Sequence, residues 1–485
     1  MTQRFAIFLL YFLVVFGIGW LSLRATRDDA DYWIAGGKLG WLMGGATMTA
    51  THVSAGTFIG TIGVMYTAGW SFGWVVLSIP LGYWFMAAVL APRFTRVREL
   101  TLPAFMEMRY YDRRVRALAA AIILVATVVY VQAQIMAGGL VANVAFGVPL
   151  TWGMIGFTAI LLAYTVVGGM IAVVYTDFFQ LAVMILSVLA AVPLALRHLG
   201  GLDGLFEAVR AVDPAVFTFD GGLAPSLLFT MGLAFMLGSV ATPEKLTRLY
   251  AMRDMRTIRR GILLTIVLAT GINLLVFILA LVAIALFPAL PSGDLAMPMI
   301  AYSVLPSTIG TLMLAAVTAA MMSTVDSLLI IAGSALSHDI YQSVLNPAAD
   351  PRRRMRVARA GVVIVGTIPV VLLLTGIGRG ELVQFIVLLF TALMASSFFI
   401  PVVLGVYWRR ATREGAVSAM VGGIFVTFLW KLFGAATIDP VLPGFLTSAS
   451  LMVGVSLLTP APPESALRPY FEEPATLAEG DAGSA

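Results

Sequence analysis

Oxygen-bearing groups recur at helical spacing along one apolar segment near residue 320. In the run LAAVTAAMMSTVDSLLIIAGSALSHDIY, residues 314–341, Ala320, Ser323, Thr324 and Ser327 stand at i, i+3, i+4 and i+7 and therefore share one helix face. The Ala320 carbonyl and the hydroxyls of Ser323 and Thr324 would present uncharged hard oxygens, which suit a weakly held Na+. Alternatively, the hydroxyls bond to the carbonyl one turn earlier and only bend the helix. Spacing alone leaves both interpretations open.

Two acidic residues lie within apolar segments, where a carboxylate is expensive. Asp326 flanks the hydroxyl face, and a carboxylate there costs ~2.5–3.5 kcal/mol on insertion scales, which makes a functional role the first hypothesis. It would be a cation ligand, a proton carrier or a buried acceptor of hydroxyl hydrogen bonds. Asp177, in YTVVGGMIAVVYTDFFQ, stands near the end of its segment, where simple solvation explains it equally well.

A third polar stretch, TMTATHVSAGTFIGT at residues 47–61, interrupts a long uncharged segment. It is rich in glycine and alanine, and it contains groups that hydrocarbon solvates badly: Thr51, His52, Ser54, Gly56 and Thr57. Small residues allow close helix packing. They also allow the helix to unwind, which would free carbonyl and N–H groups to bind an ion and a solute.

A tyrosine and a glutamine form a further polar pair. In VVYVQAQIMAGG, Tyr130 and Gln134 are spaced at i and i+4, so the phenol and the amide share a face. Such pairs in a membrane helix either hold helices together or line a cavity. Both roles remain open from the sequence.

The composition requires a membrane protein. Of the 485 residues, 60% are hydrophobic and 11% are charged, with a mean hydropathy of +0.96, whereas soluble domains carry about 25% charged residues. The absence of cysteine excludes disulfides and thiolate metal sites. His52, His198 and His338 lack the spacing of metal ligands, and no nucleophile–base pair is visible, so we expect no enzyme. Asp177 and Asp326 are the only acids expected in the interior.

The apolar runs predict an all-α polytopic membrane protein, because a spanning helix needs ~20 apolar residues and must satisfy its backbone internally. Thirteen candidate transmembrane segments are found, at residues 4–23, 38–67, 71–91, 117–146, 150–172, 177–196, 225–247, 258–287, 308–336, 357–376, 381–408, 414–433 and 440–459. Residues 1–24 are interpreted as a retained first helix and not as a signal peptide. The Pro-rich, acidic residues 460–485 are predicted to be a disordered tail.

The basic residues predict orientation. Arginines concentrate in alternate loops, whereas residues 68–70, 147–149 and 288–307 contain no Lys or Arg. By the positive-inside rule, the N-terminus lies outside and the C-terminus in the cytoplasm, in the cell (plasma or inner) membrane. This count treats Lys245 and Arg248 as loop residues. Because the basic residues are confined to loops, the net charge of +5 does not indicate nucleic-acid binding.

Interrupted helices at corresponding places in two halves are typical of transporters with inverted repeats. If the repeats cover residues 38–196 and 225–408, the counterpart of segment 38–67 is segment 225–247. That region, FTMGLAFMLGSVATPEKLTR, is interrupted at Gly232, Gly238, Ser239 and Pro243. The correspondence is the one that the repeat hypothesis requires.

Several motifs resemble those of the sodium:solute symporter family. YTVVGGMIAVVYTDFFQ is the most specific, AAMMSTVDS is similar to a second family motif, and TLPAFMEMRY is similar to a third, with Ala104 in place of the usual acid; PEKLTRLYAMRD and DLAMP also recur. The resemblance covers about residues 5–430. It implies a LeuT-type fold in which two inverted five-helix repeats (38–196 and 225–408) follow an extra N-terminal helix (1–24) and precede two C-terminal helices (414–459).

The resemblance also implies binding residues. The sodium site would be formed by the backbones of Ala50 and Val53, the carbonyl of Ala320, and the hydroxyls of Ser323 and Thr324. A second cation position in some members would fall on Asp177, Ser323, Asp326 and Ser327. An aspartate here replaces one hydroxyl of that position, which leaves Na+, H+ or no ion as alternatives.

For the solute, the stretch 47–61 is similar to the branch that moves pantothenate, short monocarboxylates and amino acids. We therefore expect Na+-coupled import of a small organic carboxylate or amino acid by alternating access. Proton coupling through Asp326 and Asp177, or a transporter-like sensor module, are the alternatives. The expected solute-binding residues are Thr51, His52, Ser54, Gly56, Thr57, Tyr130, Gln134 and Ser239. The expected partners are Na+, the solute and membrane lipid, with no obligate protein partner.

Overall fold

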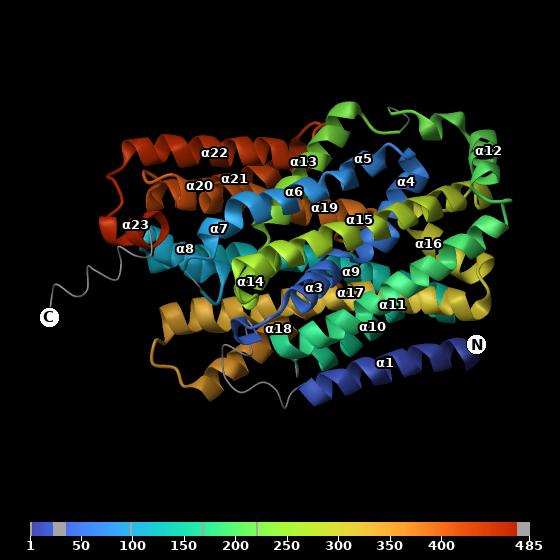
Figure 1. Ribbon diagram of the computed structural model, residues 1–485, viewed down its shortest axis with the longest axis horizontal. Helices are drawn as coiled ribbons and strands as arrows, with labels where there is room; N and C mark the ends of the chain where they lie inside the picture. Colours follow the sequence, from blue (N-terminus) through green and yellow to red (C-terminus); the bar gives the residue numbers. More distant parts are fainter. Residues whose placement is uncertain (1, 23–34, 98, 167–168, 220–221, 473–485) are drawn as a thin grey trace.

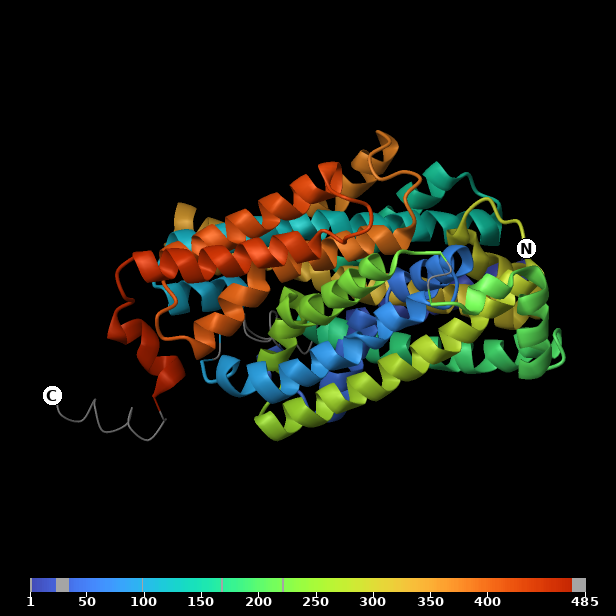
Figure 2. The ribbon, with the colours of Figure 1, turned by 90° about the horizontal axis from the view of Figure 1, so that it is seen from above.

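The computed structural model describes residues 2–22, 35–97, 99–166, 169–219 and 222–472, and over these residues the chain is helical throughout, with a single isolated bridge between Leu39 and Met252. Most of the long helices run along the long axis of the molecule (Figures 1 and 2), and the described ends of the chain lie at opposite ends of that axis (Figure 1). Helices dominate because each one satisfies its own backbone groups, as hydrocarbon requires.

Eleven helices in the described part of the chain are long and apolar enough to cross a membrane. They are α1 (Thr2–Ser22), α5 to α7 (Phe72–Phe94), α9 (Arg113–Phe146), α11 (Met170–Arg197), α13 with α14 (Pro225–Ala251), α15 (Met255–Leu286), α17 with η8 (Ser307–Leu345), α18 (Pro351–Leu374), α19 to α20 (Val383–Tyr407), α21 (Arg413–Phe433) and α22 (Val441–Leu458). The chain is therefore an all-helical, multi-pass membrane protein, and each of the eleven coincides with a predicted segment.

The two remaining predicted segments differ from a simple span. The segment predicted at 150–172 is helix α10 (Leu150–Thr165), which has only 16 residues. The segment predicted at 38–67 is divided into α3 (Trp41–His52), the π-helical turn η3 (Gly56–Thr61) and α4 (Ile62–Ala68). The thirteen predicted segments therefore correspond to eleven candidate spans, one short helix and one broken helix.

Several spans are themselves composite, and short helices connect them. The composite spans consist of α5 (Phe72–Leu77), α6 (Ile79–Phe85), η4 (Met86–Leu90) and α7 (Ala91–Phe94); α13 (Pro225–Ala241) and α14 (Pro243–Ala251); α17 (Ser307–Ser334) and η8 (Ala335–Leu345); and α19 (Val383–Met394), η9 (Ala395–Phe399) and α20 (Ile400–Tyr407). The connecting elements are η2 (Ala35–Gly37), α8 (Leu102–Tyr110), α12 (Leu202–Val212), η5 (Pro214–Phe217), η6 (Gly293–Leu295), α16 (Ala296–Met299), η7 (Ile300–Val304) and α23 (Glu464–Phe471).

Helix α17 forms the centre of the molecule. The apolar window of its span is buried along its whole length, whereas only 28% of the corresponding windows of α1, α21 and α22 is buried. It packs on α11, α9, α18 and α3, while α22 and α1 lie at opposite margins of the molecule (Figure 1). The oxygen-bearing face of α17 is therefore held away from lipid on every side.

Close helix approaches depend on glycine around the broken segment. A Cβ at Gly45 of α3 would lie 2.6 Å from the carbonyl oxygen of Gly261 on α15. A Cβ at Gly60 of η3 would lie 2.5 Å from Gln384 Oε1 and 2.9 Å from its backbone nitrogen, on α19. Both contacts exclude a side chain, so the small residues of the broken segment do pack closely on their neighbours.

The predicted disorder of residues 460–485 is wrong over part of that range. Residues Glu464–Phe471 form helix α23, in which Leu467 and Tyr470 are buried. The Tyr470 ring makes an edge contact with Phe105, with centroids 5.6 Å apart. Apolar side chains spaced three apart anchor this helix in spite of the Pro-rich, acidic composition. Residues 473–485 lie outside the described part of the chain.

Candidate functional site

The site begins where helix α3 stops. Val53 adopts an extended conformation (φ −75°, ψ 104°) directly after His52, and its N–H still donates to the Thr49 carbonyl at 2.8 Å. The next amides are satisfied by side chains: Ala55 N–H donates to Gln134 Oε1 at 3.0 Å, and Gly56 N–H donates to Ser54 Oγ at 3.0 Å. Buried backbone groups need such partners. The interruption of the helix is therefore stabilised by specific hydrogen bonds and is not a loosely packed turn.

The hydroxyls of α17 meet the last carbonyls of α3. Ser323 Oγ donates to the Ala50 carbonyl at 2.8 Å, and Thr324 Oγ1 approaches the Thr51 carbonyl at 3.2 Å. Both hydroxyls also lie near the Ala320 carbonyl, at 3.2 Å from Ser323 and 2.9 Å from Thr324. The two interpretations of the spacing thus coexist, because the same hydroxyls bond within α17 and face the broken helix.

Four of the five predicted sodium-site residues are therefore brought together, namely Ala50, Ala320, Ser323 and Thr324. Val53 lies fully buried in the break itself, three residues beyond Ala50. No hydrogen bond between Val53 and α17 is recorded among the described residues. The Thr51 carbonyl is an additional oxygen that the sequence did not single out.

An arginine joins two residues of the predicted second cation position. Arg248 of α14 donates through Nη2 to Ser327 Oγ at 2.7 Å and to Asp177 Oδ2 at 3.2 Å. Its Nε donates to Thr47 Oγ1 at 3.1 Å, and Thr47 in turn donates to Asp177 Oδ2. Both side chains of the ion pair are completely buried. A guanidinium thus lies between Asp177 and Ser327.

The Asp326 side chain is hydrogen-bonded to helix α10 and not to Arg248. Its Oδ1 accepts a hydrogen bond from Thr165 Oγ1 of α10 at 2.6 Å, and its Oδ2 has no hydrogen-bond partner within the described residues. Adjacent residues on a helix are separated by about 100°, so Asp326 and Ser327 point to different neighbours of α17. No hydrogen bond joins Asp326 to Asp177 or Ser327 within the described residues.

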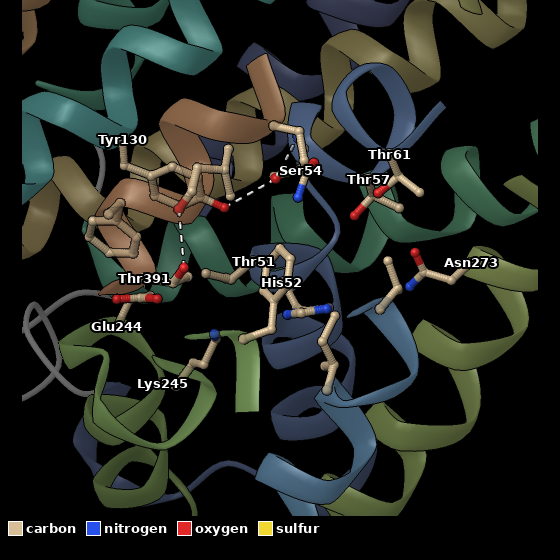
Figure 3. A pocket seen from close by; sticks show the side chains of 17 residues that line it. Thr51, His52, Ser54, Thr57, Thr61, Tyr130, Glu244, Lys245, Asn273 and Thr391 are labelled. Atoms are coloured by element: carbon tan, nitrogen blue, oxygen red, sulfur yellow. Dashed lines mark hydrogen bonds between the residues drawn. The ribbon is translucent and has the colours of Figure 1, made fainter. Parts of the chain in front are cut away.

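A cavity adjoins the break. Six of the predicted solute-binding residues line it: Thr51, His52, Ser54, Gly56, Thr57 and Tyr130 (Figure 3). The Tyr130 hydroxyl donates to Ser54 Oγ at 3.1 Å, and its ring stacks on Phe390 with centroids 4.5 Å apart. The His52 ring makes an edge contact with Tyr83, with centroids 5.5 Å apart.

Two predicted solute-binding residues are not among the residues that line this cavity. Gln134 is fully buried and accepts a hydrogen bond from the Ala55 N–H, so it stabilises the break and does not line the cavity. Ser239 is buried on α13 facing α6, where its Cβ would lie 3.0 Å from a Cβ at Gly82.

Other polar residues of the cavity were missed by the sequence reasoning. They are Thr61, Glu244, Lys245, Asn273, Gln384 and Thr391. The treatment of Lys245 and Arg248 as loop residues was wrong, because both are buried inside the candidate span Pro225–Ala251. Glu244 is likewise buried, so Asp177 and Asp326 are not the only interior acids. Charged residues directly after Pro243, within an apolar segment, were the signal that could have identified them.

Comparison with known proteins gives consistent results at three levels. A model of the sodium:solute symporter family matches residues 32–423. The chain is 27% identical to the osmoregulated proline transporter OpuE of Bacillus subtilis (strain 168), over 95% of each chain. It is 28% identical to the sodium/pantothenate symporter of Escherichia coli (strain K12), over 94% of this chain and 97% of the relative.

Solved structures show the fold. A Na+-coupled sialic acid symporter, in a substrate-bound outward-open state, superposes with a TM-score of 0.80 at 19% identity, over 95% of this chain and 98% of the other. A nucleobase-cation-symport-1 family transporter, in a closed conformation with bromovinylhydantoin bound, gives a TM-score of 0.58 at 14% identity, over 92% and 99%. The chain therefore has a LeuT-like fold.

The matched family model covers most of the chain, and the relatives match it almost from end to end. Na+ is in such transporters a cotransported ion and not a cofactor. The chain belongs to the sodium:solute symporter family, and it is a sodium-coupled transporter of small solutes and not an enzyme.

Proposed function

We propose that the protein imports a small organic carboxylate or amino acid together with Na+ by alternating access. The observation that carries this proposal is the meeting of the Ser323 and Thr324 hydroxyls with the Ala50 and Thr51 carbonyls at the break after α3. These oxygens border the same residues that line the cavity, since Thr51 belongs to both. An ion bound there would stabilise the broken helix in the conformation that holds the solute.

The sodium ligands would be the Ala50, Val53 and Ala320 carbonyls with the Ser323 and Thr324 hydroxyls. In this structure each hydroxyl donates to a carbonyl. Rotation about its Cβ–O bond would turn the hydrogen away and direct a lone pair toward the ion. All of these ligands are uncharged. An ion held by dipoles alone binds weakly enough to be released into the cell, as repeated transport requires.

We propose that a single Na+ is transported per cycle. Arg248 places a permanent positive charge against Asp177 and Ser327, and a second cation there would meet this charge in a poorly screened interior. One Na+ supplies about 2.3 kcal/mol per 100 mV of membrane potential and ~1.4 kcal/mol per tenfold gradient. That free energy supports accumulation of a solute without net charge by several hundredfold.

Coupling to a proton through Asp326 in addition to Na+ is the second candidate, and one observation favours it. Asp326 is a buried carboxylate with one oxygen bonded to Thr165 and the other without a hydrogen-bond partner in the described residues. A group in such a setting is able to exchange a proton during the cycle. The uptake experiment below tests whether a proton accompanies Na+.

We further propose the five-plus-five inverted repeat over residues 38–196 and 225–408, with α1 before it and α21 and α22 after it. Support comes from the second break, because α13 ends at Ala241 and α14 begins at Pro243, with Thr242 extended between them (φ −80°, ψ 133°). The first break lies at Val53, in the corresponding first helix of the other repeat. Thirteen membrane segments result when α10 and the broken α3–α4 segment are counted as crossing.

The proposed orientation places the N-terminus outside and the C-terminus in the cytoplasm of the cell membrane. The described ends of the chain lie at opposite ends of the long axis (Figure 1), as an odd number of crossings requires. The Arg-rich loops support the same direction. Membrane lipid would surround the exposed apolar helices.

Uptake into proteoliposomes tests the function. We expect purified protein to accumulate labelled solute from a panel that includes L-proline and pantothenate when an inward Na+ gradient is imposed, and to lose this uptake when choline replaces Na+ at constant pH. Full uptake in choline would overturn sodium coupling, and uptake in Na+ that rises further with an imposed inward proton gradient would support the additional proton. Recovery of unchanged solute from the vesicles separates transport from turnover.

A further inference from the structure

Two oppositely charged side chains stand next to each other in the wall of the solute cavity. Glu244 and Lys245 open helix α14, directly after the break at Thr242. Only 2% of Glu244 and 6% of Lys245 is exposed, and both line the cavity that Thr51 and His52 border. Figure 3 shows the two side chains extending from α14 toward this cavity.

Within the described residues, neither charged side chain has a hydrogen-bond or ion-pair partner. Within the described residues, the Lys245 ammonium forms no recorded hydrogen bond or ion pair, and its recorded contact is with the Tyr83 ring, 5.8 Å from the centroid. Glu244 Oε2 is buried without a hydrogen-bond partner. No ion pair between Glu244 and Lys245 is recorded either. In contrast to these two residues, Arg248, one turn further along the same helix, forms an ion pair with Asp177.

Buried charges are costly unless they are paired. The paired Arg248 and Asp177 neutralise each other, so the unpaired charges that remain beside the cavity are one positive and one negative. The molecule that complements both carries one negative and one positive group. We propose that the transported solute is a zwitterion of the amino-acid type, whose carboxylate pairs with Lys245 and whose ammonium pairs with Glu244.

This inference rests on the proposed function and narrows its substrate class. A simple carboxylate would satisfy Lys245 but would bring a second negative charge toward Glu244. A neutral sugar would leave both charges unpaired. A zwitterion also has no net charge, so the membrane potential acting on Na+ does not oppose its entry.

The cavity is small in this conformation and would have to widen to admit an amino acid, and part of its remaining wall is apolar. The volume open to the centre of a water-sized sphere is about 30 Å³, against roughly 10–15 Å³ for one water, so the cavity has room for only a small polar group without rearrangement. Apolar side chains, Val76, Ile79, Phe235, Val387 and Phe390, form part of the wall. They would contact a short apolar side chain of the solute.

Matched pairs of compounds test the inference. L-proline and cyclopentanecarboxylate share a ring and a carboxylate, but only proline has the ammonium, and L-alanine and propionate form a second pair. The thermal midpoint of purified protein is measured against the concentration of each compound, in Na+ and in choline. Because an amino acid makes a charged hydrogen bond that its deaminated partner lacks, we expect it to give half-maximal stabilisation at a concentration at least about tenfold lower.

Charge-neutralising variants test the roles proposed for Glu244 and Lys245. Glu244→Gln is expected to reduce the preference for the amino acid over its deaminated partner to less than about threefold, and Lys245→Gln to weaken both compounds at least about tenfold, because each removes one charged hydrogen-bond partner. Glu207→Gln and Lys38→Gln repeat the same chemical changes at exposed positions and should leave the preference unchanged. Size-exclusion elution and the ligand-free thermal midpoint show whether each variant is folded.

The outcomes separate the two proposals. Equal stabilisation by amino acids and their deaminated partners, or an unchanged preference in folded Glu244→Gln protein, would overturn the zwitterion inference and leave Na+-coupled transport in place. A Na+-dependent preference that disappears in Glu244→Gln supports it. Stabilisation that never depends on Na+ would overturn the proposed function and, with it, this inference.

Discussion

Two neighbouring regions of the core handle positive charge in opposite ways. The first, which we call the hydroxyl stripe, consists of Ala320, Ser323 and Thr324 facing the carbonyls at the end of α3. The second, the charged cluster, consists of Thr47, Asp177, Arg248 and Ser327. The hydroxyl stripe presents uncharged oxygens to a Na+ that binds and leaves in each cycle. The charged cluster already contains a permanent cation, the Arg248 guanidinium.

The difference shows how one helix can carry both a transient and a permanent ion contact. Ser323 and Ser327 are one turn apart on α17, and the Ser327 hydroxyl donates to the Ser323 carbonyl at 3.0 Å. A neutral site costs little when it is empty, because its hydroxyls bond to carbonyls. A carboxylate site would be costly when empty, and Arg248 removes that cost for Asp177. The stripe is therefore suited to exchange and the cluster to holding α3, α11, α14 and α17 together.

The largest effect is expected from breaking the charged cluster. Asp177→Asn leaves the Arg248 guanidinium buried without a counter-charge, which typically costs about 3–5 kcal/mol. We expect a large fall in the thermal midpoint of the purified protein, or loss of folded protein from the membrane.

The double variant Asp177→Asn/Arg248→Gln is the matched control. It removes both charges and should recover a substantial part of the lost stability, because the coupling of a contacting pair appears as non-additivity. Equal thermal midpoints for wild type and Asp177→Asn would contradict the assignment of this ion pair as a contact that stabilises the packing of α11 and α14.

The next effect concerns the stripe. Ser323→Ala removes one proposed sodium ligand, and loss of such a contact, worth roughly 1.5–3 kcal/mol when one partner is charged, should raise the Na+ concentration for half-maximal uptake by about tenfold to a hundredfold. The maximal rate at saturating Na+ should change less. Uptake measured against Na+ concentration checks this.

Thr318→Ala provides the control on the same helix, because the Thr318 hydroxyl is buried and bonds to the Leu314 carbonyl at 2.9 Å. It should leave the sodium dependence unchanged. A similar sodium shift in both variants would mean that α17 is generally sensitive to substitution, and the stripe would lose its special role.

The contrast between stripe and cluster also explains what the sequence could reveal. The stripe was predictable because its residues are three and four positions apart on one helix, so spacing alone gathers them. The break after His52 was predictable because small and polar residues crowd an uncharged segment. Both are local properties of the chain.

The charged cluster was not predictable in this way. Asp177 and Arg248 are 71 residues apart, and a count of charges along the chain assigns Arg248 to a loop, although it is fully buried. Glu244 and Lys245 were missed for the same reason. Asp326 was placed with the second cation position, but its rotation on α17 relative to Ser327 directs it to Thr165. Pairing across helices depends on packing, which spacing does not encode.

A buried acid outside the membrane spans extends the comparison. Asp294 accepts a hydrogen bond from the Val383 N–H at 2.9 Å and has no recorded cation partner in the described chain, and burial raises the pKa of this carboxyl to about 7. Because its folded-state pKa is above the unfolded value, its stabilising contribution is present at low pH and is lost as the pH rises toward 7. We expect the thermal midpoint to fall by a few degrees between pH 5 and pH 8.

Asp294→Asn keeps an oxygen for the Val383 N–H but cannot ionise, so this part of the pH dependence should disappear. Thermal melts of wild type and variant across the same pH range make the comparison. An identical pH dependence in both proteins would show that Asp294 is not the titrating group.

The smallest effect is expected at Asp326, which belongs to neither region although it lies beside both. Asp326→Asn retains an oxygen acceptor for the Thr165 hydroxyl and removes only the capacity to ionise. If Na+ alone drives transport, uptake at fixed Na+ should stay within about threefold of wild type, as expected for a change that preserves the hydrogen bond. If Asp326 carries a proton in each cycle, uptake should instead fall more than tenfold and lose its dependence on an imposed pH gradient. The initial rate of uptake, measured with and without that gradient, decides whether Asp326 takes part in the coupling or only in the packing.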